Sequence, residues 1–292
     1  MTDRVHIATG LDADSNRLAY SGGVPSPADQ ARAARRWGWW HYAEYRLTNM
    51  RAYLQTILIR SIGLPLLYLS SMGLGLGALV DSGSGGVDGV SYLVFVGPAL
   101  LVSSIVMEAS GEFTYPVMSG FKWQKHYYAA AASPLTPTQV TLGEVTAVGI
   151  RFVAETVVFW LMLLLFGAVT SPWSWLVILI APVAAMAFGA PLMAFAATQQ
   201  DEGAQFAFVQ RFVVMPMFLF AGTFFPLTAM PWYLQWIGWI SPMWHGTQLA
   251  RIVSYGMPNP WWLTVLHLVV LLVAAVTGTV VAARIFTRRL TR

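Results

Sequence analysis

Cysteine is absent from the 292 residues, and charged residues are scarce. Without cysteine the chain has no disulfides, no thiolate metal sites and no cysteine nucleophile. Only 10% of the residues are charged, whereas a soluble domain typically has about 25%. A soluble protein with so few charges could not cover its surface with polar groups, whereas lipid can cover an apolar surface. The scarcity of charge therefore predicts a membrane protein.

Lysine is also rare, and the sequence contains no recognisable catalytic motif. The only lysines are Lys122 and Lys125, and neither lies in the GxxxxGK[ST] pattern that cradles nucleotide phosphates. Neither HExxH nor GxSxG occurs, and the five histidines are scattered along the chain. We therefore expect no ATP site, no metal site and no enzymatic activity. The net charge of +4 is modest and its cations lie near the ends of apolar segments, so no nucleic-acid partner is expected.

Hydrophobic residues make up 57% of the chain, and they gather in segments long enough to cross a bilayer. A transmembrane helix needs about 20 mostly apolar residues. The candidate spans are 57–80, 92–113, 139–166, 175–197, 206–226 and 261–285. We therefore predict an all-α polytopic membrane protein with six transmembrane helices.

A further apolar stretch, residues 227–260, is rich in tryptophan but is broken by Pro231, Gly238, Pro242 and Gly246. We predict short external re-entrant helices there rather than a seventh span. Irregular backbone at that depth is tolerated only when it packs against protein.

The N-terminal region divides into two parts. Residues 1–30 are polar and are expected to form a disordered cytosolic tail, whereas residues 31–292 would form the transmembrane domain. Within that domain, residues 31–55 mix tryptophan and tyrosine with arginine. Such a mixture is typical of an amphipathic helix that lies in the membrane interface. A polar lead-in to the first span is the alternative.

Basic residues indicate the orientation of the spans. Arginines precede the first span, Lys122 and Lys125 lie between the second and third, and Arg288, Arg289 and Arg292 follow the sixth. With six spans, all of these positions fall on one side of the membrane. We therefore expect both termini to be cytosolic, in a multi-pass protein of the cytoplasmic membrane.

Five charged residues fall inside the predicted second and third spans. They are Glu108, Glu112, Glu144, Arg151 and Glu155. The last three are seven and four residues apart, so they share one helical face, and the four carboxylates could surround the single arginine. Charges inside spans are costly and often functional. The cluster is interpreted either as a proton relay or conformational latch, or as a structural polar group reached by water.

Two stretches resemble a known family. The first is Tyr115-Pro-Val-Met-Ser-Gly-Phe-Lys-Trp123, which runs on through Ala132-Ser-Pro-Leu-Thr-Pro to Glu144. The second is Gly222-Thr-Phe-Phe-Pro226, followed by Met230-Pro-Trp-Tyr-Leu-Gln235 and Ser241-Pro-Met-Trp-His-Gly246. Together they resemble the permease subunits of type 2 ABC exporters, in the branch of nodulation-factor (lipooligosaccharide) and daunorubicin-type export permeases.

This resemblance implies that the loop 114–138 holds a coupling helix, which docks on a separate ATP-binding subunit present in two copies. Aromatic and basic side chains are typical interface anchors. The residues expected to couple to the ATPase are Phe121, Lys122, Trp123, Gln124, Lys125, His126 and Tyr127. A cytosolic loop that merely lies on the membrane is the alternative.

The resemblance also implies that two permeases, identical or paralogous, line a transport path capped by the re-entrant segment. Residues that could line this path are Phe212, Met215, Phe218, Phe224, Phe225, Trp232 and Trp236. These apolar side chains suit an amphiphilic substrate, but they suit contact with lipid equally well.

The sequence thus predicts the permease subunit of an ATP-driven exporter that moves a glycolipid, lipooligosaccharide or hydrophobic drug. ATP and magnesium would bind to the partner subunit. A proton-coupled secondary transporter using the carboxylates inside the spans is an alternative that needs no ATPase. A lipid-modifying enzyme is a third hypothesis, but it lacks a catalytic cluster beyond these carboxylates.

Overall fold

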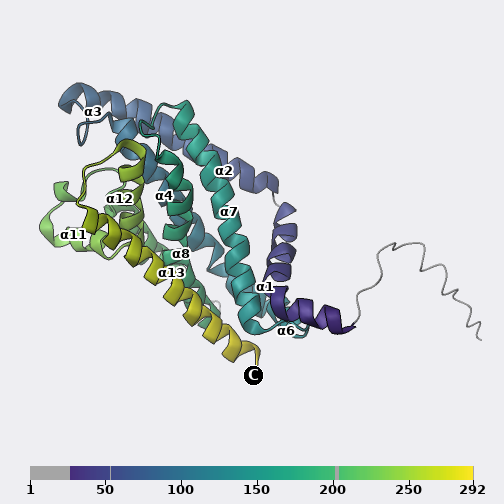
Figure 1. Cartoon of the computed structure of the whole chain (residues 1–292). Helices are drawn as coiled ribbons and strands as arrows, with labels where there is room; N and C mark the ends of the chain where they lie inside the picture. Colours follow the sequence, from purple (N-terminus) through teal and green to yellow (C-terminus); the bar gives the residue numbers. More distant parts are fainter. Residues whose placement is uncertain (1–26, 53, 201–203, 292) are drawn as a thin grey trace, which may run out of the picture.

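The computed structural model describes residues 27–52, 54–200 and 204–291, and these residues are overwhelmingly helical (Figure 1). Within them, β-structure is limited to an isolated bridge between Val87 and Val90. The predicted tail falls mostly on residues 1–26, outside the described residues; helix α1 begins at Pro27, before the expected boundary at residue 31.

The first half of the chain contains α1 (Pro27–Arg51), α2 (Leu54–Tyr68), the π-helix η1 (Leu69–Leu76), α3 (Gly77–Ser84), α4 (Tyr92–Glu112), α5 (Tyr115–Lys122), α6 (His126–Ala131) and α7 (Pro137–Leu165). The second half contains the 3₁₀-helix η2 (Ser174–Leu176), α8 (Val177–Thr198), α9 (Gln205–Val209), the π-helix η3 (Gln210–Val214), α10 (Met215–Phe220), the 3₁₀-helix η4 (Leu227–Ala229), α11 (Trp232–Trp239), α12 (Pro242–Tyr255) and α13 (Trp261–Leu290).

Five of the described helical segments are long and apolar enough to cross a membrane. They correspond to five of the six predicted spans. The exception is the predicted span 206–226, which forms a continuous apolar helix from Gln205 only to Phe220. At 1.5 Å per residue this helix is about 24 Å long, shorter than the roughly 30 Å hydrocarbon core. Its early end is explained by the packing of Arg251, described below.

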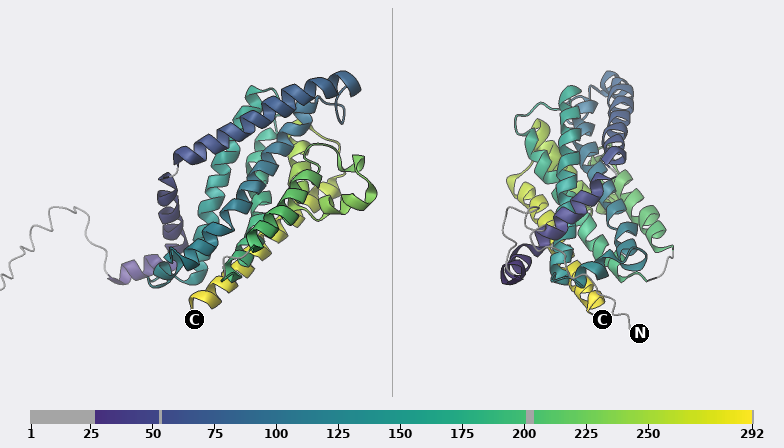
Figure 2. Two further views of the ribbon diagram at one scale, coloured as in Figure 1. Left: turned by 180° about the vertical axis from the view of Figure 1, so that it is seen from behind. Right: turned by 90° about the vertical axis from the view of Figure 1, so that its right-hand side faces the viewer.

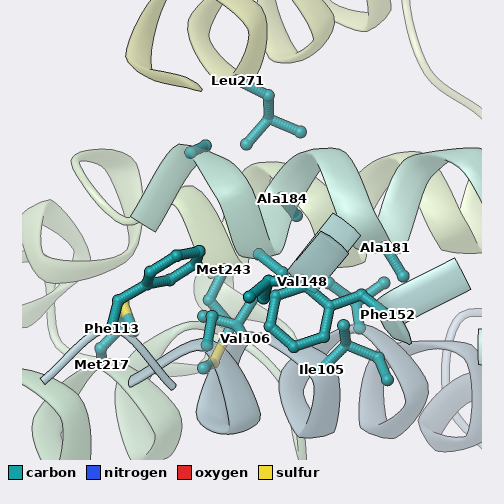
Figure 3. Packing of buried hydrophobic residues seen from close by; sticks show 14 of the residues in the cluster. Ile105, Val106, Phe113, Val148, Phe152, Ala181, Ala184, Met217, Met243 and Leu271 are labelled. Atoms are coloured by element: carbon teal, nitrogen blue, oxygen red, sulfur yellow. The ribbon is translucent and has the colours of Figure 1, made fainter. Parts of the chain in front are cut away.

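Buried residues of α4, α7 and α8 pack against one another in the core, among them Val106, Phe152 and Ala184 (Figure 3). Most residues (78%) are buried in the apolar stretch of segment Tyr92–Lys122, which contains α4, whereas few (22%) are buried in that of α13, so α4 is central and α13 is peripheral. Small residues allow the close approach of neighbouring helices. A Cβ atom on Gly246 of α12 would lie 2.7 Å from Cβ of Ala184 and 2.8 Å from Cγ1 of Val102.

Local sequence explains where α7 and α12 begin. Thr136 and Gln139 form a reciprocal capping box in front of α7, with Pro137 at the first helical position. Ser241 caps α12 by accepting a hydrogen bond from the backbone N–H of Trp244, and Pro242 is the first residue of the helix. These caps fix the entry of both helices into the bundle.

The bundle has two ends that carry different elements. At one end lie α1, the α5–α6 hairpin and the C-terminal end of α13, whereas α3 and α11 lie away from it (Figure 1). The rod formed by α2, η1 and α3 runs without a break along the outside of the bundle (Figure 2). We call the end that carries α1, the α5–α6 hairpin and the C-terminal end of α13 the hairpin end. It gathers the basic segments that the sequence placed on one side of the membrane.

Candidate functional site

A buried ionic cluster links α4 and α7. The Arg151 guanidinium contacts three carboxylates: Nε lies 2.7 Å from Glu155, Nη2 lies 3.4 Å from Glu108, and Nη1 contacts Glu112. Each helix contributes two residues spaced four apart, which places both side chains on one face. The side chains of Arg151 and Glu155 are 11% and 6% exposed, so the cluster is largely removed from solvent.

Glu144 does not belong to this cluster, and the prediction that four carboxylates surround Arg151 is wrong. Its carboxylate pairs with Arg46 of α1 at 2.7 Å. Seven residues separate Glu144 from Arg151, which corresponds to about 10 Å along a helix. The Arg46–Glu144 pair instead fastens α1 to α7.

A cavity of about 290 Å³ lies beside the ionic cluster, between α2, α4, α7 and α10. Its walls are mostly aromatic and aliphatic. Two predicted path residues, Met215 and Phe218, line it together with Glu108 and Glu155. Phe218 packs edge-on against Tyr68, with ring centroids 6.4 Å apart. The structure therefore brings part of the predicted path and part of the predicted polar cluster into one site.

The remaining predicted path residues lie elsewhere. Phe212 is exposed on η3, and Phe224 packs on Phe218 with ring centroids 5.2 Å apart. Phe225 lies in the irregular segment after α10. Trp232 and Trp236 project from α11 and are 81% and 53% exposed. The predicted set therefore does not form one continuous lining: two residues line the cavity, two lie on α11, and the other three lie on η3 and in the segment after α10.

The predicted coupling loop forms the α5–α6 hairpin, whose inner aromatic residues belong to the core. Phe121 and Tyr127 are buried, and both rings pack on Phe286 of α13, with centroid distances of 4.7 and 4.9 Å. Arg289 lies over the Phe121 ring at 4.3 Å. The prediction that Phe121 and Tyr127 anchor a partner directly is therefore wrong in this conformation, because they anchor the hairpin to α13.

The outer side of the hairpin is available to a partner. Trp123 is 49% exposed, and Gln124 and Lys125 are also exposed, whereas Lys122 and His126 are half-buried. Burial and the positive charge of Arg46 lower the pKa of His126 to about 4. His126 is therefore neutral near pH 7, and the positive charge of the hairpin comes from its lysines.

A groove of about 420 Å³ runs between this hairpin and α1. It is lined by Arg46, Tyr115, Pro116, Ser119, Trp123, Gln124 and His126. Three of the predicted coupling residues thus border one hollow at the hairpin end. Arg46, which lies in the predicted interface segment 31–55, joins them there.

Arg251 is a structural residue that sequence analysis missed. It lies in the stretch 227–260 for which external re-entrant helices were predicted, and its side chain is 1% exposed and lies over the Phe95 ring at 3.8 Å. It donates hydrogen bonds to the carbonyls of Gly222 at 2.7 Å and Thr223 at 3.2 Å. These bonds stabilise the irregular backbone that ends α10, so the helix ends at Phe220. The signal in the sequence was an arginine within an otherwise apolar segment.

Two histidines that are far apart in the sequence also meet. His245 of α12 and His267 of α13 have their Nδ1 atoms 2.7 Å apart, and both side chains are buried. Within the described residues, no three histidine, aspartate or glutamate side chains are placed to hold a metal ion. The histidine contact joins α12 to α13.

Comparison with known proteins identifies the family. Residues 44–255 match the family described as ABC-2 type transporter. The chain is 28% identical over 239 residues to nodulation protein J of Rhizobium leguminosarum bv. viciae. The aligned region covers 78% of this chain and 85% of that protein. It is 27% identical over 264 residues to nodulation protein J of Sinorhizobium fredii (strain NBRC 101917 / NGR234). That aligned region covers 88% of this chain and 95% of the relative.

The matched region includes the cavity, the ionic cluster and the hairpin. Together with the long apolar helices, the match identifies a multi-pass membrane protein and a transmembrane component of a transporter rather than an enzyme in itself. The chain belongs to the ABC-2 type transporter family.

Proposed function

We propose that this chain is the permease subunit of an ATP-driven exporter that moves an amphiphilic substrate across the cytoplasmic membrane. A separate subunit, present in two copies, binds ATP and magnesium and hydrolyses the ATP. Two permeases, identical or paralogous, line the path. The observation that supports this proposal is the α5–α6 hairpin, which lies within the region matched to the ABC-2 type transporter family and has an exposed outer side.

The hairpin is suited to transmit force because it is fixed on its inner side and exposed on its outer side. Phe121 and Tyr127 join it to Phe286, so a displacement of the hairpin is passed to α13. Trp123 and Lys125 remain at the surface, beside the groove along α1. Tryptophan at a groove is a common anchor for a partner protein.

In this proposal the helix Gln205–Phe220 and the backbone after it complete a sixth crossing. Residues Ala221, Gly222 and Thr223 are buried, so this irregular backbone is covered by protein, as membrane depth requires. Six crossings place both termini on one side. The basic residues in α1, in the hairpin and in the last turn of α13 support the cytosol as that side.

Helix α1 then lies at the cytosolic interface, and α11 and α12 form the external re-entrant segment. With 8 and 14 residues, α11 and α12 are about 12 and 21 Å long, too short to cross alone. The exposed Trp232 and Trp236 suit an interfacial position at the outer leaflet. The amphiphile would use the cavity between α2, α4, α7 and α10, which offers an apolar lining.

The experiment is co-purification of the permease with its ATPase, followed by measurement of ATPase stimulation. Trp123→Ala and Lys125→Gln are expected to lower the yield of complex and the stimulation together, because they change only the exposed side of the hairpin. Trp261→Ala is the matched control, since it removes an exposed tryptophan from the start of α13, whereas the other end of that helix lies at the hairpin end.

Complex formation that is unchanged by both hairpin substitutions would remove the hairpin from the coupling role. Transport that persists without any ATPase and stops when the proton gradient is dissipated would instead favour a proton-coupled transporter that uses the carboxylates around Arg151.

A further inference from the structure

A pocket of about 440 Å³ lies between α6, the end of α8 and the last turns of α13. Its polar lining residues come from all three places: Tyr128, Thr198, Gln200, Arg288 and Arg289. The volume falls within the range of small-ligand pockets, about 300 to 1,000 Å³. The pocket shares no lining residue with the cavity between α2, α4, α7 and α10 or with the groove along α1. It is therefore a separate candidate site.

The pocket lies where two membrane-crossing helices end. The apolar segment that contains α8 ends at Thr198, and α13 has Arg288 and Arg289 in its last turn. Because residues from both ends line one pocket, the two helices end at the same level. Polar headgroups replace hydrocarbon where membrane-crossing helices end. The pocket therefore lies at a membrane interface.

The charge of the pocket is positive. Among its described lining residues, Arg288 and Arg289 are charged and none is acidic. Arg288 is exposed, and neither arginine forms an ion pair with a carboxylate of the described residues. Guanidinium groups bind phosphate through charge-assisted hydrogen bonds in a forked geometry. The pocket is thus suited to an anion, and a phosphate fits its donors best.

Arg289 is held in position by the protein. Its Nη1 donates hydrogen bonds to the carbonyls of Ala197 at 2.6 Å and Gln199 at 3.0 Å, and the guanidinium lies over the Phe121 ring at 4.3 Å. A guanidinium has five N–H donors on three nitrogens. Nε and Nη2 make no hydrogen bond to the described residues. These two nitrogens form one fork that remains available to a phosphate.

An exposed apolar face of α13 leads away from the pocket. Val281 and Val273 precede Arg288 by seven and fifteen residues, which places both within about 60° of it around the helix axis. Their side chains are 45% and 55% exposed. At 1.5 Å per residue, this face runs about 22 Å from the pocket into the hydrocarbon region. An acyl chain attached to a headgroup in the pocket would lie along it.

We propose that this pocket binds the phosphate of an anionic phospholipid. Arg288 and Arg289 bind the phosphate, and an acyl chain lies along the exposed face of α13 that carries Val281. Basic pockets between transmembrane helices are suited to anionic headgroups. A free phosphate has the same headgroup chemistry, but it would leave the apolar face unused. The inference goes beyond the proposed function, because it requires neither a particular substrate nor an ATPase.

The test measures lipid binding to the full-length permease by native mass spectrometry. The protein is held in a neutral detergent, so a preference for an anionic lipid reports a site on the protein rather than attraction to a charged membrane. The probes are phosphatidylglycerol and phosphatidylcholine with identical acyl chains. We expect phosphatidylglycerol to bind at least about tenfold more tightly, which is about 1.4 kcal/mol.

Equal affinities for the two lipids would overturn the proposal. Asp201 and Glu202 follow Gln200 in the sequence and lie outside the described residues. If these two acidic residues neutralise the arginines of the pocket, equal affinities are the result. The comparison of the two lipids therefore tests the net charge of the pocket without any variant.

Variants then locate the phosphate. Arg288→Gln is expected to weaken phosphatidylglycerol binding about fivefold or more, which is about 1 kcal/mol, and Arg288→Lys should lose less because it keeps the charge. Arg288 is exposed, so its replacement leaves the fold intact. Arg284→Gln is the matched control, because Arg284 is an exposed arginine of the same helix that does not line the pocket. A loss in Arg284→Gln as large as that in Arg288→Gln would contradict binding in the pocket.

Two final arms distinguish the lipid from other occupants. Inorganic phosphate in large molar excess is expected to change phosphatidylglycerol binding by less than about twofold, because it has no acyl chain. Full displacement of the lipid by inorganic phosphate would overturn the assignment to a phospholipid. Co-purification with the ATPase is expected to be unchanged in Arg288→Gln. If that variant loses the ATPase but keeps phosphatidylglycerol binding, the pocket belongs to a protein interface and the proposal is wrong.

Discussion

Replacing Arg251 with methionine is expected to lower the free energy of unfolding by about 3 kcal/mol. The substitution removes the donors to the carbonyls of Gly222 and Thr223, in the buried segment that ends α10. Each buried acceptor without a donor costs about 1–3 kcal/mol. The loss is partly offset because a buried guanidinium, which costs several kcal/mol to desolvate, is also removed.

The assay is denaturant unfolding in detergent micelles, followed by tryptophan fluorescence. Arg211→Met is the matched control, because Arg211 is exposed on η3. Arg251→Lys is expected to recover only part of the loss, since an ammonium cannot reproduce the forked geometry of the guanidinium. A change of less than about 0.5 kcal/mol in Arg251→Met, the range of surface substitutions, would refute the role assigned to this arginine.

Three further predictions concern the hairpin end. Tyr127→Phe is expected to leave the free energy of unfolding nearly unchanged, because the buried hydroxyl of Tyr127 has no hydrogen-bond partner. Tyr127→Ala should lower it by about 3–5 kcal/mol through loss of packing. Denaturant unfolding of the two variants checks both values. A double-mutant cycle of Arg46→Met and Glu144→Gln is expected to give a coupling energy of about 1–3 kcal/mol, measured by unfolding; a value near zero would contradict the fastening of α1 to α7. Since the folded state lowers the pKa of His126 to about 4, the unfolded state binds more protons between about pH 4 and pH 6.5, so stability should fall as pH decreases through that range. His126→Asn should reduce this slope in unfolding measurements at pH 5 and pH 7.5.

The long helices were predictable because each is defined by its own sequence. The predicted span 139–166 is α7 (Pro137–Leu165), and the predicted span 92–113 is α4 (Tyr92–Glu112). Continuous apolar runs with prolines and caps at their ends contain this information locally. The pairing of Arg151 with Glu155 was predictable for the same reason, since four residues separate them on one helix.

Tertiary contacts determine the features that were predicted wrongly. The inward orientation of Phe121 depends on Phe286, which is 165 residues away and is invisible to a local pattern. The partner of Glu144 is Arg46 on a separate helix, rather than the arginine nearest on its own helix. The end of α10 at Phe220 depends on Arg251, in another helix. Each of these requires the packing of elements, which composition and periodicity do not specify.

Transport in proteoliposomes that contain this permease and its ATPase tests whether ATP hydrolysis on a separate subunit drives the permease. The measurement is the ATP-dependent movement of a fluorescent amphiphile between leaflets. We expect transport that requires ATP, stops when the ATPase is replaced by a variant unable to hydrolyse ATP, and continues when the proton gradient is dissipated. Equal transport by the permease without the ATPase would contradict this expectation.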